Sequence, residues 1–109
     1  ADELAYRIYK VTKDFPRYEL FGIVSQMRRS AVSVPANIAE GYAHYGNREK
    51  VRFYEIANCS LTELEYYIYF VHQRLNYIDK DQHDELSGLR DETGRMLNGL
   101  IKAARRKDI

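Results

Sequence analysis

Apolar residues recur every three or four positions along most of this chain, and the longest such run covers about residues 47 to 76. This spacing places the apolar side chains on one face of an α-helix, whereas a half-buried strand would need strict alternation. The run therefore predicts one long helix, with an inward seam made of Phe53, Ala57, Leu61, Leu64, Ile68, Val71 and Leu75.

Three further segments repeat the pattern, at about residues 2–13, 17–42 and 79–106. Pro35 lies inside the second of these, where a proline removes one backbone hydrogen bond of a helix. Because the apolar period continues on both sides of Pro35, we predict a single helix that is kinked there. Four helices with short connections close most simply as an antiparallel up-and-down four-helix bundle, here one all-α domain over residues 1–109.

Local signals mark the ends of these helices. Phe15-Pro16 ends the first, because the residue before a proline is disfavoured in the helical conformation. Asn47 is suited to cap the third helix, and Asp79 or Asp81 is suited to cap the fourth. The residues expected to face inward are Leu20, Val24, Met27, Ala31, Val34, Ile38 and Tyr42 in the second helix and Leu86, Leu89, Thr93, Met96, Leu97, Leu100 and Ile101 in the fourth.

The composition is that of a globular and almost neutral protein. The net charge is +1, so a case for nucleic-acid binding depends on local patches rather than on bulk charge. The single cysteine, Cys59, rules out an internal disulfide and fits a reducing compartment. No run approaches the ~18 apolar residues of a membrane span, and the chain does not begin with a signal-like pattern. We therefore expect a cytoplasmic protein that has no membrane contact.

The usual catalytic and metal-binding patterns are not found in the sequence. A di-iron bundle needs an acidic residue three positions before a histidine on two helices. None of His44, His72 and His83 has such a neighbour. Cys59 has no histidine within one helical turn, and the serines lack an adjacent base. We therefore expect a protein that is not an enzyme and that holds no metal or cofactor.

A polar stripe runs along the second helix. At about 100° per residue, one narrow sector holds Gln26, Arg29, Ser30, Ser33, Asn37, Glu40 and His44. Such a stripe is usually a solvated face, but Ser33 and Asn37 are mediocre helix formers beside an internal proline. Arg29 and Glu40 lie towards opposite ends of the stripe, and Arg28 lies at the edge of the apolar side. A structural ion-pair role and a ligand-facing role both stay open.

Two groups of basic residues are suited to attract phosphate. One lies in the first turns of the third helix, where free backbone N–H groups also favour anions. The other lies at the end of the fourth helix. Together with Arg28 and Arg29, the candidates for contacting nucleic acid are Arg48, Lys50, Arg52, Lys102, Arg105, Arg106 and Lys107. The alternative is that both groups are simply solvated helix ends.

The third helix is apolar or aromatic on every side between Tyr66 and Val71. A helix of this kind must be covered on every side, and the neighbours within one small bundle hide only part of it. A second chain is therefore implied. The residues expected at the resulting oligomer interface are Tyr66, Tyr67, Tyr69 and Phe70.

Residues 26–41 read QMRRSAVSVPANIAEG. This segment resembles the hallmark of the four helix bundle protein family, first noted as open reading frames inside intervening sequences of 23S ribosomal RNA genes. Shorter similarities to that family are Phe15-Pro16 followed by Glu19-Leu20-Phe21-Gly22, the segment 59–65 (CSLTELE) and the segment 96–102 (MLNGLIK). The resemblance thus extends over nearly the whole chain.

The resemblance implies a cytosolic protein that assembles into ring-like homopentamers of four-helix protomers. A distant relative, the accessory variability determinant of diversity-generating retroelements, binds a reverse transcriptase and nucleic acid through a basic surface. We therefore predict a non-enzymatic, homo-oligomeric adaptor that binds RNA or a nucleoprotein such as a reverse transcriptase. The alternative is a structural or protein-interaction module that has a protein partner and binds no nucleic acid.

Overall fold

A computed structural model describes residues 1–106, and within that range the chain has four α-helices and no strand. The helices are α1 (Asp2–Thr12), α2 (Ile23–Ala43), α3 (Asn47–Tyr69) and α4 (Lys80–Arg106). A 3-10 turn, η1 (Arg17–Glu19), precedes α2, and a π-helical turn, η2 (Phe70–Arg74), follows α3. The prediction of an all-α chain with four helices is confirmed for the described residues.

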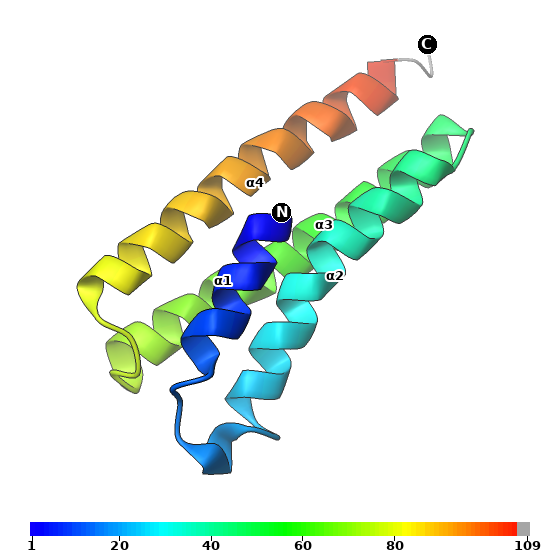
Figure 1. Ribbon diagram of the computed structural model, residues 1–109. Coiled ribbons are helices and arrows are strands. Elements are labelled where there is room, and N and C mark those ends of the chain that lie inside the picture. The colour runs from blue at the N-terminus through cyan, green and yellow to red at the C-terminus, as the bar shows by residue number, and fades with distance from the viewer. Residues whose placement is uncertain (107–109) are drawn as a thin grey trace.

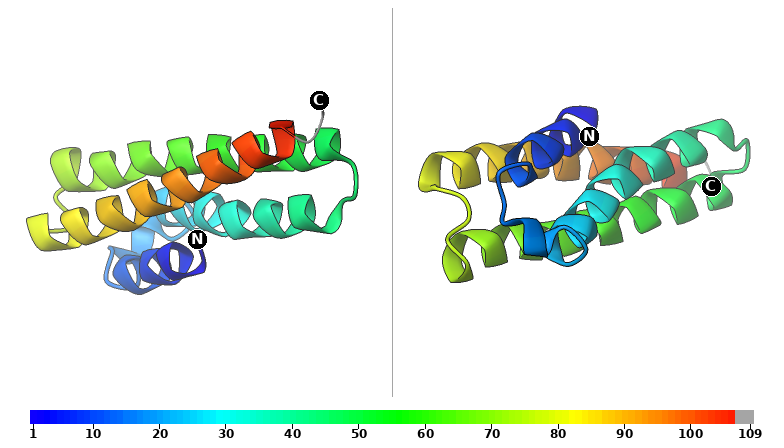
Figure 2. Two further views of the ribbon diagram at one scale, coloured as in Figure 1. Left: turned by 90° about the horizontal axis from the view of Figure 1, so that it is seen from above. Right: turned by 60° about the horizontal axis from the view of Figure 1, so that its bottom comes forward.

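Three long helices and one short helix make up the molecule (Figure 1). α3 lies against both α2 and α4, and α1 packs on α2 and α4. The molecule is elongated, with dimensions of 49 × 24 × 19 Å, and Figure 2 shows that α1 covers only part of the length of its neighbours. α2 continues through Pro35 as one helix. The regular up-and-down bundle and the kink at Pro35 stay predictions.

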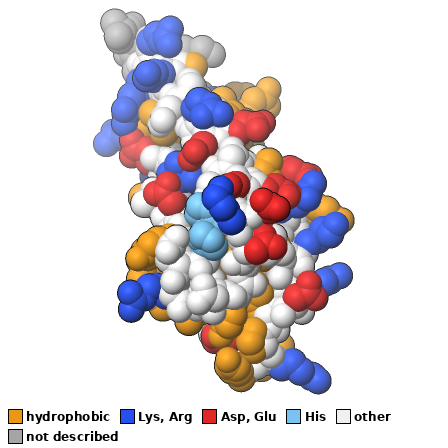
Figure 3. All heavy atoms as spheres, turned by 90° about the vertical axis from the view of Figure 1, so that its left-hand side faces the viewer, with side chains coloured by type: hydrophobic (Ala, Val, Ile, Leu, Met, Phe, Trp, Pro, Cys, Tyr) orange, Lys and Arg blue, Asp and Glu red, His pale blue; other side chains and the backbone are white. Residues whose placement is uncertain are grey.

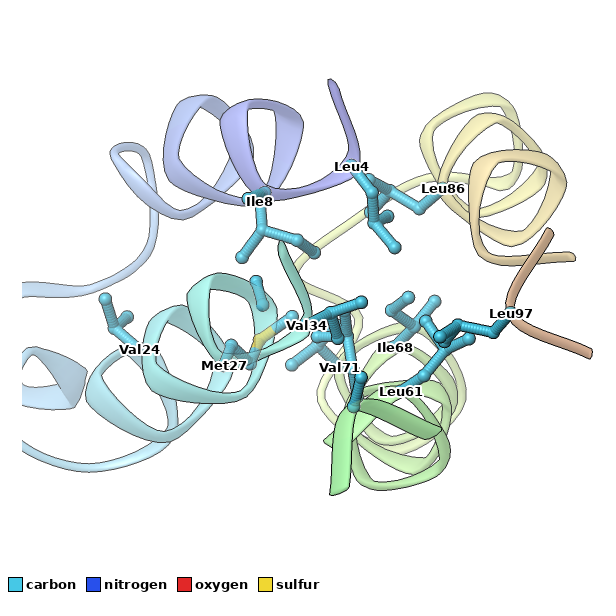
Figure 4. Close-up of a cluster of buried hydrophobic side chains, with 14 of the residues drawn as sticks. Leu4, Ile8, Val24, Met27, Val34, Leu61, Ile68, Val71, Leu86 and Leu97 are labelled. Atoms are coloured by element: carbon cyan, nitrogen blue, oxygen red, sulfur yellow. The ribbon is translucent and has the colours of Figure 1, made fainter. Parts of the chain in front are cut away.

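The core is one apolar cluster to which all four helices contribute (Figure 4). Burying a side chain of the size of leucine or isoleucine stabilises a fold by roughly 1.5–3 kcal/mol, so this cluster holds the helices together. The large side chains that are almost fully buried are Leu4, Ile8, Met27, Val34, Leu61, Leu64, Val71, Leu86 and Leu97.

Within residues 1–106 no helix has the length and apolarity that crossing a membrane requires.

The predicted helix pattern is wrong at three positions in the seams. The second helix was expected from Arg17, but η1 and a bend occupy that stretch, which leaves Leu20 exposed. Tyr42 was expected to face inward and is 77% exposed, because α1 does not reach this end of α2 (Figure 1). Met96 is also exposed rather than buried. Leu20 is thus exposed because no α-helix forms there, and Tyr42 because the helix that would cover it ends earlier.

The helix ends differ in how they are capped. Asp79 caps α4 in a reciprocal box, since its carboxylate accepts from the Gln82 backbone N–H at 2.8 Å and the Gln82 side chain accepts from the Asp79 N–H at 2.9 Å. Asn47 is not the cap of α3, because the helix begins at Asn47 and Gly46 takes the cap position. After η2 the chain leaves the helical path at Asn76, whose φ of 56° suits asparagine better than most side chains.

Candidate nucleic-acid interface

The two groups of basic side chains lie at the same end of the molecule. Both views of Figure 2 place the last turns of α4 beside the turn that joins α2 to α3. An ion pair between the Arg105 guanidinium and the Glu55 carboxylate connects α4 to α3 there. We call residues 42–55 and 102–106 the basic end. It holds six basic and two acidic side chains, whereas the whole chain has seventeen and sixteen.

This local excess creates a cationic surface on a nearly neutral chain. Lys and Arg side chains gather towards the upper end of the face drawn in Figure 3, while positive and negative side chains alternate around its middle. Clustered positive charge raises the local concentration of phosphate anions, and the effect falls with salt. The fold therefore joins what the sequence offers as two separate patches.

Lys50 has a structural task at this end. Its ammonium donates to the carbonyl oxygens of Gly41 at 3.3 Å and Tyr42 at 3.0 Å. These carbonyls belong to the last turn of α2, where no further helical turn supplies donors and a cation interacts favourably with the helix dipole. The placement offsets the cost of a lysine in the first turn of α3, so Lys50 holds the α2–α3 turn in place.

The other basic side chains of this end divide into two kinds. Arg52 pairs with Glu49 at 3.4 Å, and Arg105 pairs with Glu55. Such exposed pairs contribute little to stability and exchange readily with other anions. Within residues 1–106, no ion pair involves Arg48, Lys102 or Arg106, and all three side chains are exposed. Their positive charge is therefore the most accessible to a phosphate. Lys107 lies outside the described residues.

Arg28 lies away from the basic end and joins α2 to α1. Its Nε donates to Thr12 Oγ1 at 3.0 Å, and its guanidinium lies 4.8 Å from the centre of the Tyr9 ring. The Thr12 hydroxyl in turn donates to the Ile8 carbonyl at 2.7 Å. This side chain is engaged in helix packing. Arg29, the next residue, is exposed on α2.

The polar stripe of α2 is divided between the α2–α3 contact and solvent. Ser33 and Ser60 share a hydrogen bond of 2.8 Å between their hydroxyls, and the Asn37 amide donates to the Ser33 carbonyl at 2.9 Å. The Ser30 hydroxyl, 4% exposed as a residue, donates to Glu63 at 2.6 Å. The polar side chains of Ser30, Ser33 and Asn37 therefore form hydrogen bonds within α2 and with side chains of α3.

At the ends of the stripe the side chains face solvent. Arg29 and Glu40 are both exposed, and no ion pair joins them among the described residues. Glu40 lies 3.7 Å from the His44 ring nitrogen Nε2. The sequence could not distinguish a solvated stripe from a helix contact, because it does not show that Ser60 and Glu63 of α3 face these positions.

The aromatic cluster at the end of α3 and the start of η2 lies at the opposite end of the molecule (Figure 1). The Tyr66 ring centre is 6.0–6.3 Å from those of Tyr67, Tyr69 and Phe70. Tyr66 and Tyr69 are exposed, whereas Tyr67 and Phe70 are half-buried. Burial, together with the nearby Glu63 carboxylate, raises the pKa of Tyr67. One protomer therefore covers this cluster only in part.

We call residues 13–21 and 66–81 the aromatic end. The two segments meet where the Tyr77 hydroxyl donates to Glu19 at 2.7 Å and lies 3.3 Å from the Tyr18 hydroxyl. Phe21 is 93% exposed here. This end holds four basic and four acidic side chains, so it has no charge excess.

Two exposed aromatic side chains of the basic end were not among the candidate site residues predicted from the sequence. Tyr42 and Tyr45 are 77% and 100% exposed, the second at the tip of the α2–α3 turn. The sequence signal for them is the pair of glycines, Gly41 and Gly46, that lies on either side of these tyrosines, since residues at or beside a turn lie on the surface.

Among the described residues, no group of three or more His, Cys, Asp or Glu side chains is placed to hold a metal ion.

Together these features define a class: a small all-α protein with a cationic surface at one end of its helices. A family model for the 23S rRNA-intervening sequence protein matches residues 1–99. The chain therefore belongs to this family, as its motifs predict.

A solved structure supports the same assignment. The chain is similar to the crystal structure of a protein of unknown function from the S23 ribosomal protein family of Bacteroides thetaiotaomicron. The two are 27% identical, the match covers 92% of this chain and 93% of the other, and the TM-score is 0.80. No match was found among curated proteins.

Proposed function

We propose that the protein is a non-enzymatic adaptor that binds RNA, alone or within a nucleoprotein, through its basic end. The observation that carries this proposal is the meeting of the two basic groups at one end, with Arg48, Lys102 and Arg106 exposed and outside any ion pair of the described residues. Membership of a family named after a ribosomal RNA insertion supports RNA as the ligand.

The physics of phosphate binding makes the proposal specific. Each phosphate that a basic side chain neutralises releases condensed counterions, so affinity falls with salt by a slope of about 0.7–0.9 per contact on logarithmic axes. Three unpaired cations therefore account for a slope of roughly 2 to 3. Arg52 and Arg105 increase this salt slope further where RNA phosphates displace their carboxylate partners.

A charge-neutralised variant tests the proposal against a matched control. Replacing Arg48, Lys102 and Arg106 with glutamine is expected to weaken binding of a labelled RNA hairpin with a single-stranded tail and to lower the salt slope by roughly 2 to 3. The control replaces Lys13, Arg17 and Arg74, three exposed cations of the aromatic end, with glutamine. Equal loss in both variants, or no binding by the wild type near physiological salt, contradicts the proposal.

The proposed adaptor is a homo-oligomer, and the ring-like homopentamer is the assembly that the family resemblance favours. In this proposal each protomer is a cytoplasmic up-and-down bundle whose second helix is kinked at Pro35. The exposed Tyr66 and Tyr69 support self-association, because tyrosine is enriched where surfaces become buried on assembly. A stable monomer in light scattering at micromolar concentration contradicts it.

A second candidate is a protein-interaction module that binds no nucleic acid. The aromatic end favours it, since exposed Tyr18 and Phe21 lie there among balanced charges. Recovery of one specific protein from the native host, unchanged by RNase, together with no RNA in the eluate, supports this candidate over the first.

A further inference from the structure

The basic end presents two tyrosine rings to solvent, one in the last turn of α2 and one in the turn that joins α2 to α3. Tyr45 is wholly exposed and Tyr42 is 77% exposed. The Lys50 ammonium lies 5.5 Å from the centre of the Tyr42 ring, and Arg48 follows Tyr45 by three residues. A ligand that covered these rings would remove their apolar surface from water, which is favourable.

The turn that carries these rings is held from several sides. Gly41 packs directly on Tyr54, since a Cβ at Gly41 would lie 2.6 Å from the Tyr54 ring. The His44 ring stacks on the Phe53 ring with centres 4.9 Å apart and planes 5° from parallel. Lys50 adds hydrogen bonds to the carbonyls of Gly41 and Tyr42, so contacts hold the chain on both sides of Tyr45. A backbone that is ordered in this way loses less entropy on binding.

We propose that Tyr42 and Tyr45 stack on unpaired bases, so that the basic end takes single-stranded segments of RNA rather than duplex. This inference rests on the proposed function and names its ligand class. Aromatic rings beside cations are the usual means of holding single strands, because every base offers a π-face while the cations follow the phosphates. In a duplex the bases already stack on each other, and the rings reach only phosphates and sugars.

In this proposal the cations and the tyrosine rings of the basic end have separate roles in binding. Arg48, Lys102 and Arg106 supply charge without selecting between strands. Tyr42 and Tyr45 supply the selection, since only an unpaired base covers a ring. Removing the rings therefore reduces the preference for single strands and leaves the charge-driven binding in place.

A tryptophan reporter tests the stacking directly, because the chain has no tryptophan of its own. In the Tyr45→Trp variant, a single-stranded dodecaribonucleotide is expected to quench the fluorescence, and an RNA duplex with the same number of phosphates is expected to leave it nearly unchanged. Tyr6→Trp on α1, where Tyr6 is 55% exposed, is the control and is expected to respond to neither. Equal quenching by strand and duplex overturns the proposal.

Substitution of the rings supplies the second measurement. Tyr42→Leu and Tyr45→Leu are each expected to weaken single-strand binding about five- to hundredfold, and Tyr→Phe at either position is expected to keep it. Duplex binding and the thermal unfolding of the variants should stay as in the wild type. If the leucine variants bind as tightly as wild type while the charge-neutralised variant does not, the stacking proposal is wrong and the adaptor proposal stands. If the wild type binds neither RNA, both are wrong.

Discussion

The basic end and the aromatic end both expose aromatic rings, yet they differ in what surrounds those rings. At the basic end Tyr42 and Tyr45 lie among six cations and two carboxylates. At the aromatic end Tyr66 and Phe21 lie among four cations and four carboxylates. In the proposed function, the rings at one end stack on bases and those at the other end contact protein. The two ends differ in the charge that surrounds the rings.

The two ends are also held together differently. The α2–α3 turn depends on backbone contacts, with Lys50 on the carbonyls of α2 and Gly41 against Tyr54. The aromatic end depends on side-chain hydrogen bonds of Tyr77 with Tyr18 and Glu19, which raise the pKa of the Tyr77 hydroxyl. A turn fixed through its backbone is the better base for a preformed binding surface.

The largest effect expected concerns self-association through the aromatic end. Replacing Tyr66 and Tyr69 with glutamate puts charge into a surface that assembly would bury. Residues central to an interface cost about 2 kcal/mol or more when removed, so the dissociation constant should rise at least about thirtyfold in sedimentation experiments. The matched change, Tyr42→Glu with Tyr45→Glu, should leave the assembly intact. If it breaks the assembly and the first change does not, the roles of the two ends are reversed.

A methyl group at Gly41 tests how closely the basic end is packed. In an open helix, Gly→Ala gains up to about 1 kcal/mol. Here the Cβ would lie 2.6 Å from the buried Tyr54 ring, so Gly41→Ala should lower the free energy of unfolding by about 1–3 kcal/mol in urea titrations. Gly99→Ala, where nothing lies within 4 Å, is the control and should stabilise. A stabilising effect of Gly41→Ala would show that the Tyr54 ring or the turn shifts at little cost in free energy.

Between the two ends, the polar stripe of α2 should prove structural. Ser30→Ala removes the hydrogen bond to Glu63 and should cost about 1 kcal/mol of stability. The neighbouring exposed Arg29→Ala should change the free energy of unfolding by less than about 0.5 kcal/mol. Should Ser30→Ala be neutral in stability and reduce RNA binding instead, the stripe belongs to the binding surface.

The smallest effect expected is a titration at the acidic start of α4. A hydrogen bond from Lys80, and then one from His83, lowers the pKa of Asp84. Because the folded pKa lies below the unfolded one, this carboxylate stabilises the fold above its unfolded pKa, and the contribution is lost as the pH falls through the folded value. In an NMR titration, Lys80→Gln should move the Asp84 pKa back towards the ordinary range. An unchanged value would show that the pair does not form in solution.

Much of the fold follows from the helical period alone. The number of helices and the interior of α3, with Leu61 and Leu64 fully buried, agree with the prediction. One error occurs where the apolar pattern continues beyond the helix that covers it. Tyr42 continues the seam of α2, but α1 is only 11 residues long, so nothing covers that end. The sequence itself ends the first helix near Phe15-Pro16, which makes this helix too short to cover the whole of α2.

The sequence predicted the basic residues of the candidate site, but it did not predict that the two groups lie at the same end of the molecule. Both basic patches were evident, and their meeting depends on how α4 lies against α3, which the sequence does not show. It also could not show that Lys50 caps α2 or that Arg28 joins α2 to α1, because each task depends on backbone and side-chain positions brought together by folding. The same limit applies to the hydroxyl pair of Ser33 and Ser60.

The most direct test of a basic end that binds RNA is to map where RNA touches the chain. A single-stranded dodecaribonucleotide with 4-thiouridine is crosslinked to the wild-type protein by light, and the modified peptides are identified by mass spectrometry. The expected result is adducts within residues 42–55 and 102–106, with Tyr42 and Tyr45 among the sites. Adducts confined to residues 13–21 and 66–81, or spread evenly over the chain, would contradict the central claim.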